Sequence, residues 1–391
     1  MEDIIISKKT PFYDVGVKYG AKMAELFGYW LPAEYATGHA EEYIGTRTRA
    51  SLCDLDYMAV ATIKGPDAFA YIQKVFTNDF TTLGIGGIRY TAIPNEQGNM
   101  VDDGTCWHTG ENEYMFISGD ESDYAWLEKN AEGFDIELTN ITDQWTTLAL
   151  QGPLSRKILE KLTDVDLGFK FYTFKKGKVG GVDCTIARIG FTGEFGYEIH
   201  FSSELGTEMW EKVMAAGKEE GIVPCGQLAL ESLRQEAGMI LVGNEHNKTI
   251  NPFGASIGWT VKLGKTNDFN GQQALKEIIR NGVTKTLVWF RVDGIVEAKT
   301  GDPIFSGEKE IGYVTSGSLT PGTDHSTALG YVRPEYAITG SHYTICSDGT
   351  GYDAALSLVP LYDPGKYRRM GRIPAEHAAA AILCLSQTET A

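Results

Sequence analysis

The sequence lacks the residue spacings on which metal sites and disulfide frameworks are built. Its six cysteines lie far apart and form no C-x-x-C pair, so no zinc site, iron–sulfur cluster or disulfide framework is predicted. The seven histidines are scattered along the chain. The pairs Cys106 with His108 and Glu245 with His246 have no third ligand beside them, and such pairs are more often incidental than metal-binding. The sequence therefore predicts no metal.

Long apolar runs and a cleavable leader are also missing. No stretch reaches the roughly eighteen apolar residues that a membrane-spanning helix needs. The chain opens on the acidic Met1-Glu2-Asp3 and has neither the charged first region nor the long apolar core of a signal peptide. We therefore expect a cytoplasmic protein with no membrane partner.

Positive charge is scarce. The formal net charge is -17 and no basic run occurs, whereas proteins that bind the nucleic-acid backbone need clustered Lys and Arg. No nucleic-acid partner is expected. An anionic ligand such as a polyglutamylated folate would have to find a local positive patch, because the average field of the chain repels it.

The sequence motifs of the common nucleotide and hydrolase sites are absent. Gly84, Gly86 and Gly87 resemble a phosphate loop, but Arg89-Tyr90 follow where the third glycine and the helix should begin. No Walker sequence, H-E-x-x-H or G-x-S-x-G occurs. A dinucleotide cofactor, phosphoryl transfer, zinc proteolysis and serine hydrolysis are therefore all disfavoured.

What is present is a repeated local pattern. A strand-like run over 58–63 enters Gly65-Pro66, and apolar residues then follow at helical spacing; the run 147–150 enters Gly152-Pro153 in the same way. The repeat predicts two related α+β subdomains, at about 1–145 and 146–282, within one region 1–282. The chain is long enough for two or three such units.

Other elements follow from composition and periodicity. Helices are expected over 204–220 and 228–239, and a hairpin is expected from strands at 184–188 and 197–201. From residue 283 the chain turns to short β-rich runs at 287–292, 311–315 and 342–345. We predict a β-rich C-terminal domain over 283–372, followed by a tail over 373–391.

Two acidic segments are candidates for chemistry. The loop 95–104 contains the adjacent Asp102 and Asp103; alone it is more typical of a solvated turn, and only one of the two acids can face a cleft if the strand alternates. The segment 190–198 places Glu194 and Glu198 among aromatic residues. It fits equally a hairpin with exposed acids or a site where a carboxylate accepts two N–H bonds from an aminopyrimidine ring.

Several short phrases occur in one order along the chain and together resemble the glycine cleavage T-protein (aminomethyltransferase) family and its tetrahydrofolate-dependent demethylase relatives. They lie between Thr10 and Val332, and they are Gly65-Pro66-Asp67-Ala68, Thr77-Asn78-Asp79, Arg89-Tyr90-Thr91, Asn95-Glu96-Gln97-Gly98 with Asp102-Asp103, Gly193-Glu194-Phe195-Gly196-Tyr197-Glu198, Ser232-Leu233-Arg234-Gln235-Glu236-Ala237-Gly238 and Ile311-Gly312-Tyr313-Val314-Thr315-Ser316-Gly317. The resemblance implies a three-domain α+β ring, with two related subdomains and a barrel-like C-terminal domain around a cavity for tetrahydrofolate.

The resemblance also assigns roles to single residues. It implies that Asp103 is the catalytic carboxylate and that Glu198 binds the edge of the pterin ring. The remaining folate-pocket residues that it implies are aromatic, and they are Tyr90, Tyr172, Phe191 and Trp259, of which Phe191 stands where many relatives carry tyrosine.

Some positions depart from the aminomethyltransferase pattern. Leu230 stands where these enzymes usually carry an arginine that meets folate, and Asp56-Tyr57 replaces the usual Ser-His. Asn251-Pro252-Phe253 is more similar to the dimethylsulfoniopropionate demethylase branch. These differences leave the folate expectation in place and turn the expected donor toward a small methylated molecule.

Three functions follow as hypotheses. The first is transfer of a methyl group from a small donor to N5 of tetrahydrofolate, with Tyr57 or Trp107 as an aromatic wall for an onium donor, or else as packing. The second is aminomethyl transfer from a lipoylated carrier protein. The third, from another class, is a folate-binding protein without catalysis, against which the presence of Asp103 and Glu198 counts.

Overall fold

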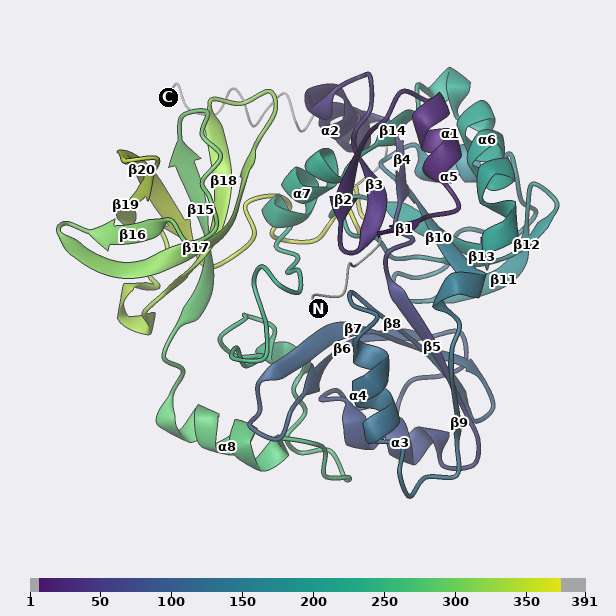
Figure 1. Cartoon of the computed structure of the whole chain (residues 1–391), viewed down its shortest axis with the longest axis horizontal. Coiled ribbons are helices and arrows are strands. Elements are labelled where there is room, and N and C mark those ends of the chain that lie inside the picture. Colours follow the sequence, from purple (N-terminus) through teal and green to yellow (C-terminus); the bar gives the residue numbers. More distant parts are fainter. Residues whose placement is uncertain (1–6, 374–391) are drawn as a thin grey trace, which may run out of the picture.

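The computed structural model describes residues 7–373, which form three lobes around a common centre (Figure 1). One lobe is a closed six-stranded barrel, and each of the other two is built on its own mixed sheet with helices. None of the helices in this part of the chain is long and apolar enough to cross a membrane.

The first α+β lobe contains a five-stranded sheet in the order β6-β7-β8-β5-β9. Its strands are β5 (Ala59–Lys64), β6 (Ile88–Pro94), β7 (Met100–Gly110), β8 (Glu113–Ser118) and β9 (Glu137–Asn140), and its helices are α3 (Ala68–Val75) and α4 (Asp123–Lys129). Tyr71, Ile72 and Val75 of α3 are fully buried with Phe116 of β8. The helical spacing of apolar residues after Gly65-Pro66 therefore marks the face that packs on the sheet.

The second α+β lobe contains a six-stranded sheet in the order β11-β12-β13-β10-β4-β14. Its strands are β4 (Ser51–Asp54), β10 (Trp145–Gln151), β11 (Phe174–Val179), β12 (Val182–Ala187), β13 (Gly196–Ser202) and β14 (Val223–Cys225), and its helices are α5 (Ser155–Leu159) and α6 (Gly206–Ala216). The expected hairpin is present as β12 and β13, in which Thr185 pairs with His200. The expected helix over 204–220 is α6, which is shorter because 3-10 turns flank it.

The two α+β lobes share one chain path. In each, a strand (β5 or β10) enters a Gly-Pro turn and a helix, and a three-stranded meander then returns to pair with that strand. Gly65 (φ 133°) and Gly152 (φ 120°) occupy equivalent turns. A Cβ on either would lie 2.5 Å from Asp135 O or 2.6 Å from Arg49 O, respectively, so both turns require glycine. The prediction of two related α+β units is confirmed.

The N-terminal elements do not follow the expected division near residue 145. Strand β4 pairs with β10 and β14, so this early segment belongs to the second sheet. Around it lie α1 (Tyr13–Lys18), α2 (His39–Thr48), α7 (Gln227–Glu236) and a small sheet of β1 (Lys8–Lys9), β2 (Lys22–Leu26) and β3 (Tyr29–Glu34). Local periodicity could not reveal this, because strand partners are chosen by long-range packing.

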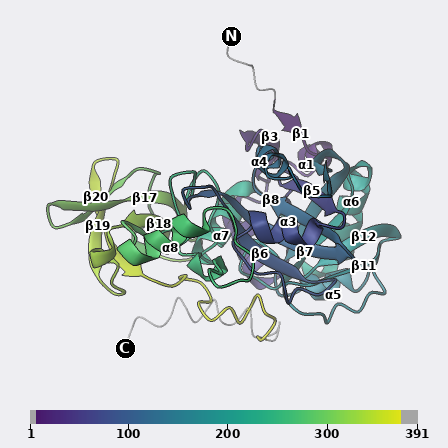
Figure 2. The ribbon, with the colours of Figure 1, turned by 90° about the horizontal axis from the view of Figure 1, so that it is seen from below.

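The third lobe is the barrel. Helix α8 (Gln272–Asn281) leads into it, and its strands are β15 (Thr286–Asp293), β16 (Pro303–Ser306), β17 (Lys309–Leu319), β18 (His325–Val332), β19 (His342–Ser347) and β20 (Thr350–Ser357). The three β-rich runs expected after residue 283 lie in β15, β17 and β19. Figure 2 shows the segment after β20 running back from the barrel toward the other lobes. The predicted tail at 373–391 lies, apart from its first residue, outside the described residues.

A buried ionic network fixes this returning segment. Glu194 accepts bonds from Arg47 Nη1 at 3.2 Å and from Arg368 Nε at 3.0 Å, and Arg47 Nη2 also binds Glu236 at 2.9 Å. All four side chains are at most 5% exposed. Glu194 is therefore a structural anion that joins α2, α7 and the segment after the barrel. The sequence allowed two roles for Glu194, an exposed acid of a hairpin or a hydrogen-bond acceptor for a ligand, and the structure supports neither.

Replacing Glu194 by Gln should lower the free energy of unfolding by about 3–5 kcal/mol, because the buried guanidinium groups of Arg47 and Arg368 each lose one carboxylate partner, although Arg47 keeps Glu236. Denaturant unfolding of the full chain measures this. The matched control is Glu160→Gln, which breaks the half-exposed pair of Arg156 and Glu160 and should cost no more than about 0.5 kcal/mol. Equal effects of the two substitutions would contradict the prediction.

A second buried cation holds the segment between α7 and α8. Lys265 Nζ donates to the carbonyls of Phe76 at 2.6 Å and of Asn78 at 2.9 Å, and the residue is 8% exposed. Burial lowers the pKa of Lys265 to about 7, against the opposing influence of Asp79. The ammonium form is therefore disfavoured in the folded state relative to the unfolded chain.

The pH dependence of stability follows. Between pH 7 and the ordinary lysine pKa of about 10.4, the unfolded chain holds a proton that folded Lys265 has released, so folding becomes more favourable as pH rises. The stability of the wild type relative to Lys265→Met should increase by up to about 1.4 kcal/mol per pH unit in this window. Urea unfolding of both proteins at several pH values tests this, and parallel curves would show that the shift is absent.

Candidate functional site

The acidic pair lies in β7, where the two carboxyl groups have different surroundings. Asp103 pairs with Ala92 of β6, and its side chain is 15% exposed, whereas that of Asp102 is 1% exposed. Asp102 accepts backbone N–H bonds from Asp103 at 2.7 Å and from Gly119 at 3.1 Å. Asp103 is thus the member of the pair that is accessible.

The environment of Asp102 disfavours its charged form. Burial, followed by the nearby acids Asp123 and Asp103, raises the pKa of Asp102 well above its usual range. Burial also raises the pKa of Asp123. Two like charges this close cannot both ionise readily, so the charged form of Asp102 is disfavoured.

His246 meets this pair from a distant part of the sequence. Its Nε2 lies 2.6 Å from Asp103 Oδ1 and 3.6 Å from Asp102 Oδ1, and its side chain is fully buried. From the sequence alone, His246 is expected to be incidental, which this contact contradicts. No local pattern could have identified it, because 143 positions separate it from Asp103.

A cavity of about 760 Å³ lies beside this cluster, between β6 and the segment before α8. Its lining residues are Asn78, Asp79, Thr82, Ile88, Arg89, Tyr90, Tyr172, Trp259, Val261, Lys262, Leu263, Gly264 and Lys265. Three of the predicted folate-pocket residues, Tyr90, Tyr172 and Trp259, are therefore together. The rings of Tyr90 and Trp259 stack at 5.6 Å, and Trp259 remains 54% exposed.

Both predicted carboxylates, Asp103 and Glu198, affect the pKa of tyrosines that line the cavity. Burial and then Asp103 raise the pKa of Tyr90. Burial raises the pKa of Tyr172 to about 12; Arg369 opposes this change, and both Asp103 and Glu198 add to it. Tyr172 is therefore close enough to Asp103 and Glu198 for both charges to act on its hydroxyl. The segment after the barrel brings the guanidinium group of Arg369 close to the same tyrosine. The sequence analysis did not identify Arg369.

The backbone at Tyr172 is strained. Its φ is 62°, in the left-handed region that costs a non-glycine residue of order 1 kcal/mol. Its amide donates to Arg188 O at 3.0 Å, and its carbonyl accepts from the amide of Ile88 at 2.9 Å. These bonds hold Tyr172 between the two α+β lobes, so its ring reaches the cavity from a fixed backbone.

Glu198 and Phe191 come from the hairpin region of the second lobe. Glu198 lies on β13 between Ala149 of β10 and Ala187 of β12, is 5% exposed, and stands 3.5 Å from His200 Nε2. Phe191 is half-buried and packs against the apolar cluster that contains Tyr57 and Leu230. Neither residue is among those that line the 760 Å³ cavity.

The two residues proposed as an aromatic wall are both buried. Trp107 is 0% exposed, its indole contacts Phe174 and His200 at centroid distances of 5.2 and 4.9 Å, and its Nε1 donates to Thr105. Trp107 is a core residue and is wrong as a substrate wall. Tyr57 is 5% exposed and stacks at 4.8 Å beneath Phe27, so it lies just below the surface.

Asp102, Asp103 and His246 also form a group whose potential metal-ligating atoms lie within 4.8 Å of one another, among the described residues. These atoms already have partners. Asp103 bonds directly to His246, and both oxygens of Asp102 accept backbone N–H bonds. The arrangement is that of a hydrogen-bonded cluster, in which an ion would have to replace existing bonds.

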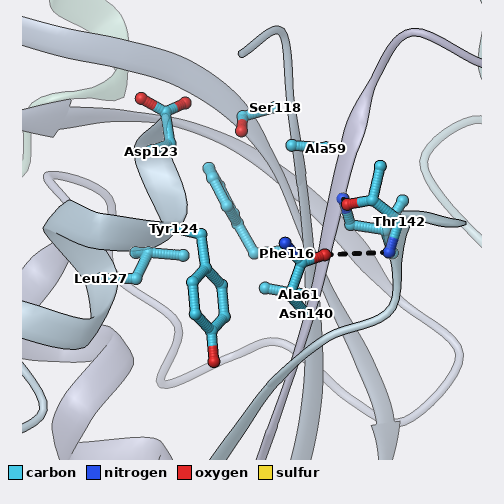
Figure 3. A pocket seen from close by; sticks show the side chains of 10 residues that line it. Ala59, Ala61, Phe116, Ser118, Asp123, Tyr124, Leu127, Asn140 and Thr142 are labelled. Atoms are coloured by element: carbon cyan, nitrogen blue, oxygen red, sulfur yellow. Dashed lines mark hydrogen bonds between the residues drawn. The ribbon is translucent and has the colours of Figure 1, made fainter. Parts of the chain in front are cut away.

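A second, much smaller cavity of about 10 Å³ lies between α4 and the first sheet (Figure 3). Asp123, Ser118 and Tyr124 line it, and Thr142 N donates to Asn140 Oδ1 at its edge. Its size matches a single water molecule. The space is too small for a substrate.

Comparisons with known proteins agree with this architecture. The GCVT N-terminal domain matches residues 12–265, and the glycine cleavage T-protein C-terminal barrel domain matches residues 285–363. Proteins named aminomethyltransferase from Bacillus mycoides (strain KBAB4) and Desulfitobacterium hafniense (strain DSM 10664 / DCB-2) are 38% and 37% identical over 368 residues. These alignments cover 93% of this chain and 100% and 99% of the relatives.

A solved structure matches nearly the whole fold. The crystal structure of glycine cleavage system aminomethyltransferase T from Bartonella henselae superposes with a TM-score of 0.85 at 28% identity, over 92% of this chain and 99% of that protein. Two family models match consecutive parts of the chain, and the solved structure matches its fold. These findings confirm the expected three-domain α+β architecture and the expected family. The chain is a one-carbon transferase and belongs to the glycine cleavage T-protein family.

Proposed function

We propose that this protein transfers an aminomethyl group to tetrahydrofolate, with a lipoylated carrier protein as donor. One observation supports this most strongly: Tyr90, Tyr172 and Trp259 line a single cavity, and β6, the strand that carries Tyr90, pairs with β7 at Asp103. The names of the relatives favour aminomethyl transfer over methyl transfer, which the sequence alone had put first.

The lining chemistry suits a folate. Pterins present an aminopyrimidine edge, and a buried carboxylate such as Glu198 accepts two parallel N–H bonds from such an edge. Tyr90, Tyr172 and Trp259 offer ring faces to a planar heterocycle. The volume of about 760 Å³ is within the range of ligand pockets. Tyr90, Tyr172 and Trp259 would hold tetrahydrofolate, and Glu198 and Phe191, which lie outside the cavity lining, would have to reach it from the second lobe.

Asp103 would orient the folate amine that attacks the one-carbon unit. A carboxylate beside this nitrogen stabilises the positive charge that develops there and assists loss of its proton. The lobes contribute alignment, since holding both reactants in attack geometry supplies about 7–11 kcal/mol of the barrier. Because its environment disfavours the charged form, Asp102 adds less negative charge beside the reacting nitrogen than an exposed acid would.

Methyl transfer from a small methylated donor is the second candidate, and Leu230 is the observation that favours it. Leu230 is 2% exposed in an apolar cluster with Tyr57, at the position where the sequence pattern of aminomethyltransferases expects an arginine. An apolar, aromatic surrounding suits an onium methyl group better than a free amine.

Product identity decides between the two. Purified protein with tetrahydrofolate and an aminomethyl-loaded lipoyl carrier should give methylenetetrahydrofolate and ammonia, identified by mass spectrometry. The parallel reaction with sulfonium, quaternary ammonium and aryl methyl ether donors should give no 5-methyltetrahydrofolate. Methyl product without the carrier would reverse the order of the two proposals.

Replacing Asp103 by Asn should lower kcat by about 10²–10⁴-fold, because the amide keeps the shape and loses the charge and the basic oxygen. Tetrahydrofolate binding, followed by quenching of intrinsic fluorescence, should change much less than kcat. The matched control is Asp353→Asn, which removes a half-exposed acid on the barrel far from the cavity. Wild-type turnover in Asp103→Asn would contradict the catalytic role of Asp103, whereas folate binding without turnover in the wild type would support a folate-binding protein without catalysis.

A further inference from the structure

We infer that His246 is a positioning residue for Asp103: its Nε2–H binds Oδ1 and so leaves Oδ2 directed to the folate amine. This inference rests on the proposed role of Asp103 in the function above. Its structural basis is the 2.6 Å contact between two side chains from different parts of the chain, at a buried imidazole.

The hydrogen-bond pattern around His246 fixes which ring nitrogen donates. Nδ1 is buried and has no partner among the described residues. A proton on Nδ1 would leave a buried donor unsatisfied, which costs more than leaving an acceptor bare. The neutral tautomer with its proton on Nε2 is therefore favoured, and it donates to the Asp103 carboxylate.

The backbone that carries His246 is held from two sides. The preceding residue, Glu245, is fully buried and accepts bonds from Arg234 Nη1 of α7 at 2.8 Å and from Thr315 Oγ1 of β17 at 2.9 Å. Its carbonyl accepts from Tyr331 Oη of β18 at 2.6 Å. Helix α7 and the barrel therefore jointly fix the segment 241–247, which keeps the backbone of His246 in place beside β7.

A strand irregularity makes this anchor possible. The register of β17 against β18 shifts between Val314 and Ser316, so Thr315 is an extra residue in the strand. Without the bulge, consecutive residues would point to opposite faces of the strand. With it, the hydroxyls of both Thr315 and Ser316 reach the Glu245 carboxylate.

The consequence for catalysis is geometric. A carboxylate free to rotate would present either oxygen to the folate nitrogen, whereas one pinned at Oδ1 presents a single oxygen in one plane. Asp102 Oδ1, 3.6 Å from the same imidazole, is itself occupied by the Asp103 amide. His246 is thus the group that holds Oδ1 of Asp103, next to Tyr90, which also interacts with this carboxylate.

The test is a double-mutant cycle in the full-length protein, assayed with tetrahydrofolate and the aminomethyl-loaded carrier. His246→Leu should lower kcat by about 10- to 100-fold, the effect of losing one hydrogen bond to a charged group, with a smaller change in KM for tetrahydrofolate. His246→Gln keeps an N–H donor near the Nε2 position and should recover most of the loss. In the double variant Asp103→Asn/His246→Leu, turnover should fall no further than in Asp103→Asn alone.

A spectroscopic readout and a matched control accompany the cycle. Proton NMR should show a downfield, exchange-protected imidazole N–H in the wild type that disappears in His246→Leu and moves in Asp103→Asn. His342→Leu removes a His–Asp contact of the same 2.6 Å length that is 62% and 50% exposed on the barrel. This control should leave both turnover and the downfield signal unchanged.

The outcomes separate the two proposals. If Asp103→Asn loses turnover and His246→Leu does not, the positioning role is overturned and the proposed function stands. If the two substitutions multiply in the double variant, His246 acts independently of Asp103 and the inference fails. If Asp103→Asn keeps wild-type turnover, the catalytic role of Asp103 and the positioning role fall together.

Discussion

The site depends on the hydrogen bonds that the buried carboxylate of Glu245 accepts. It bonds to Arg234 on α7 and to two hydroxyls on β17, and its backbone carbonyl accepts from Tyr331 on β18. One residue therefore joins the barrel to the second α+β lobe, and its neighbour His246 contacts the first. Removing this carboxylate would take one of two acidic partners from the buried guanidinium of Arg234, which would keep only Glu231, and this is unfavourable. The three lobes meet where the chemistry is proposed to occur.

The acids of this protein illustrate how environment assigns roles to identical side chains. Asp102 is buried near Asp123, which disfavours its charged form, while the side chain of Asp103, one residue along the same strand, is partly accessible. Glu194 neutralises two buried guanidinium groups, whereas Glu198, four residues later, lies beside His200 and acts on the ring of Tyr172. In each pair the partners that the fold supplies separate a structural acid from a functional candidate.

The segment after the barrel has two tasks. Through Arg368 it completes the buried network around Glu194, and through Arg369 it places positive charge near Tyr172. Leu230 supplies no charge at the position where the family pattern expects an arginine. Adjacent residues of this segment, Arg368 and Arg369, therefore act in the buried network and beside the proposed folate pocket, respectively.

The sequence by itself determined the class of the protein and the positions of its local elements. The two Gly-Pro pairs and the apolar period after the first of them predict a strand, a turn and a helix from the sequence alone, whereas the steric need for glycine at both turns is shown by the structure. Ordered motifs identified the family and indicated Asp103 and Glu198. Only the tertiary structure decided that β4 joins the second sheet, that Trp107 is core, that Glu194 is structural and that His246 meets Asp103. Each of these depends on a contact between residues far apart in the chain, for which local periodicity and motif spacing carry no signal.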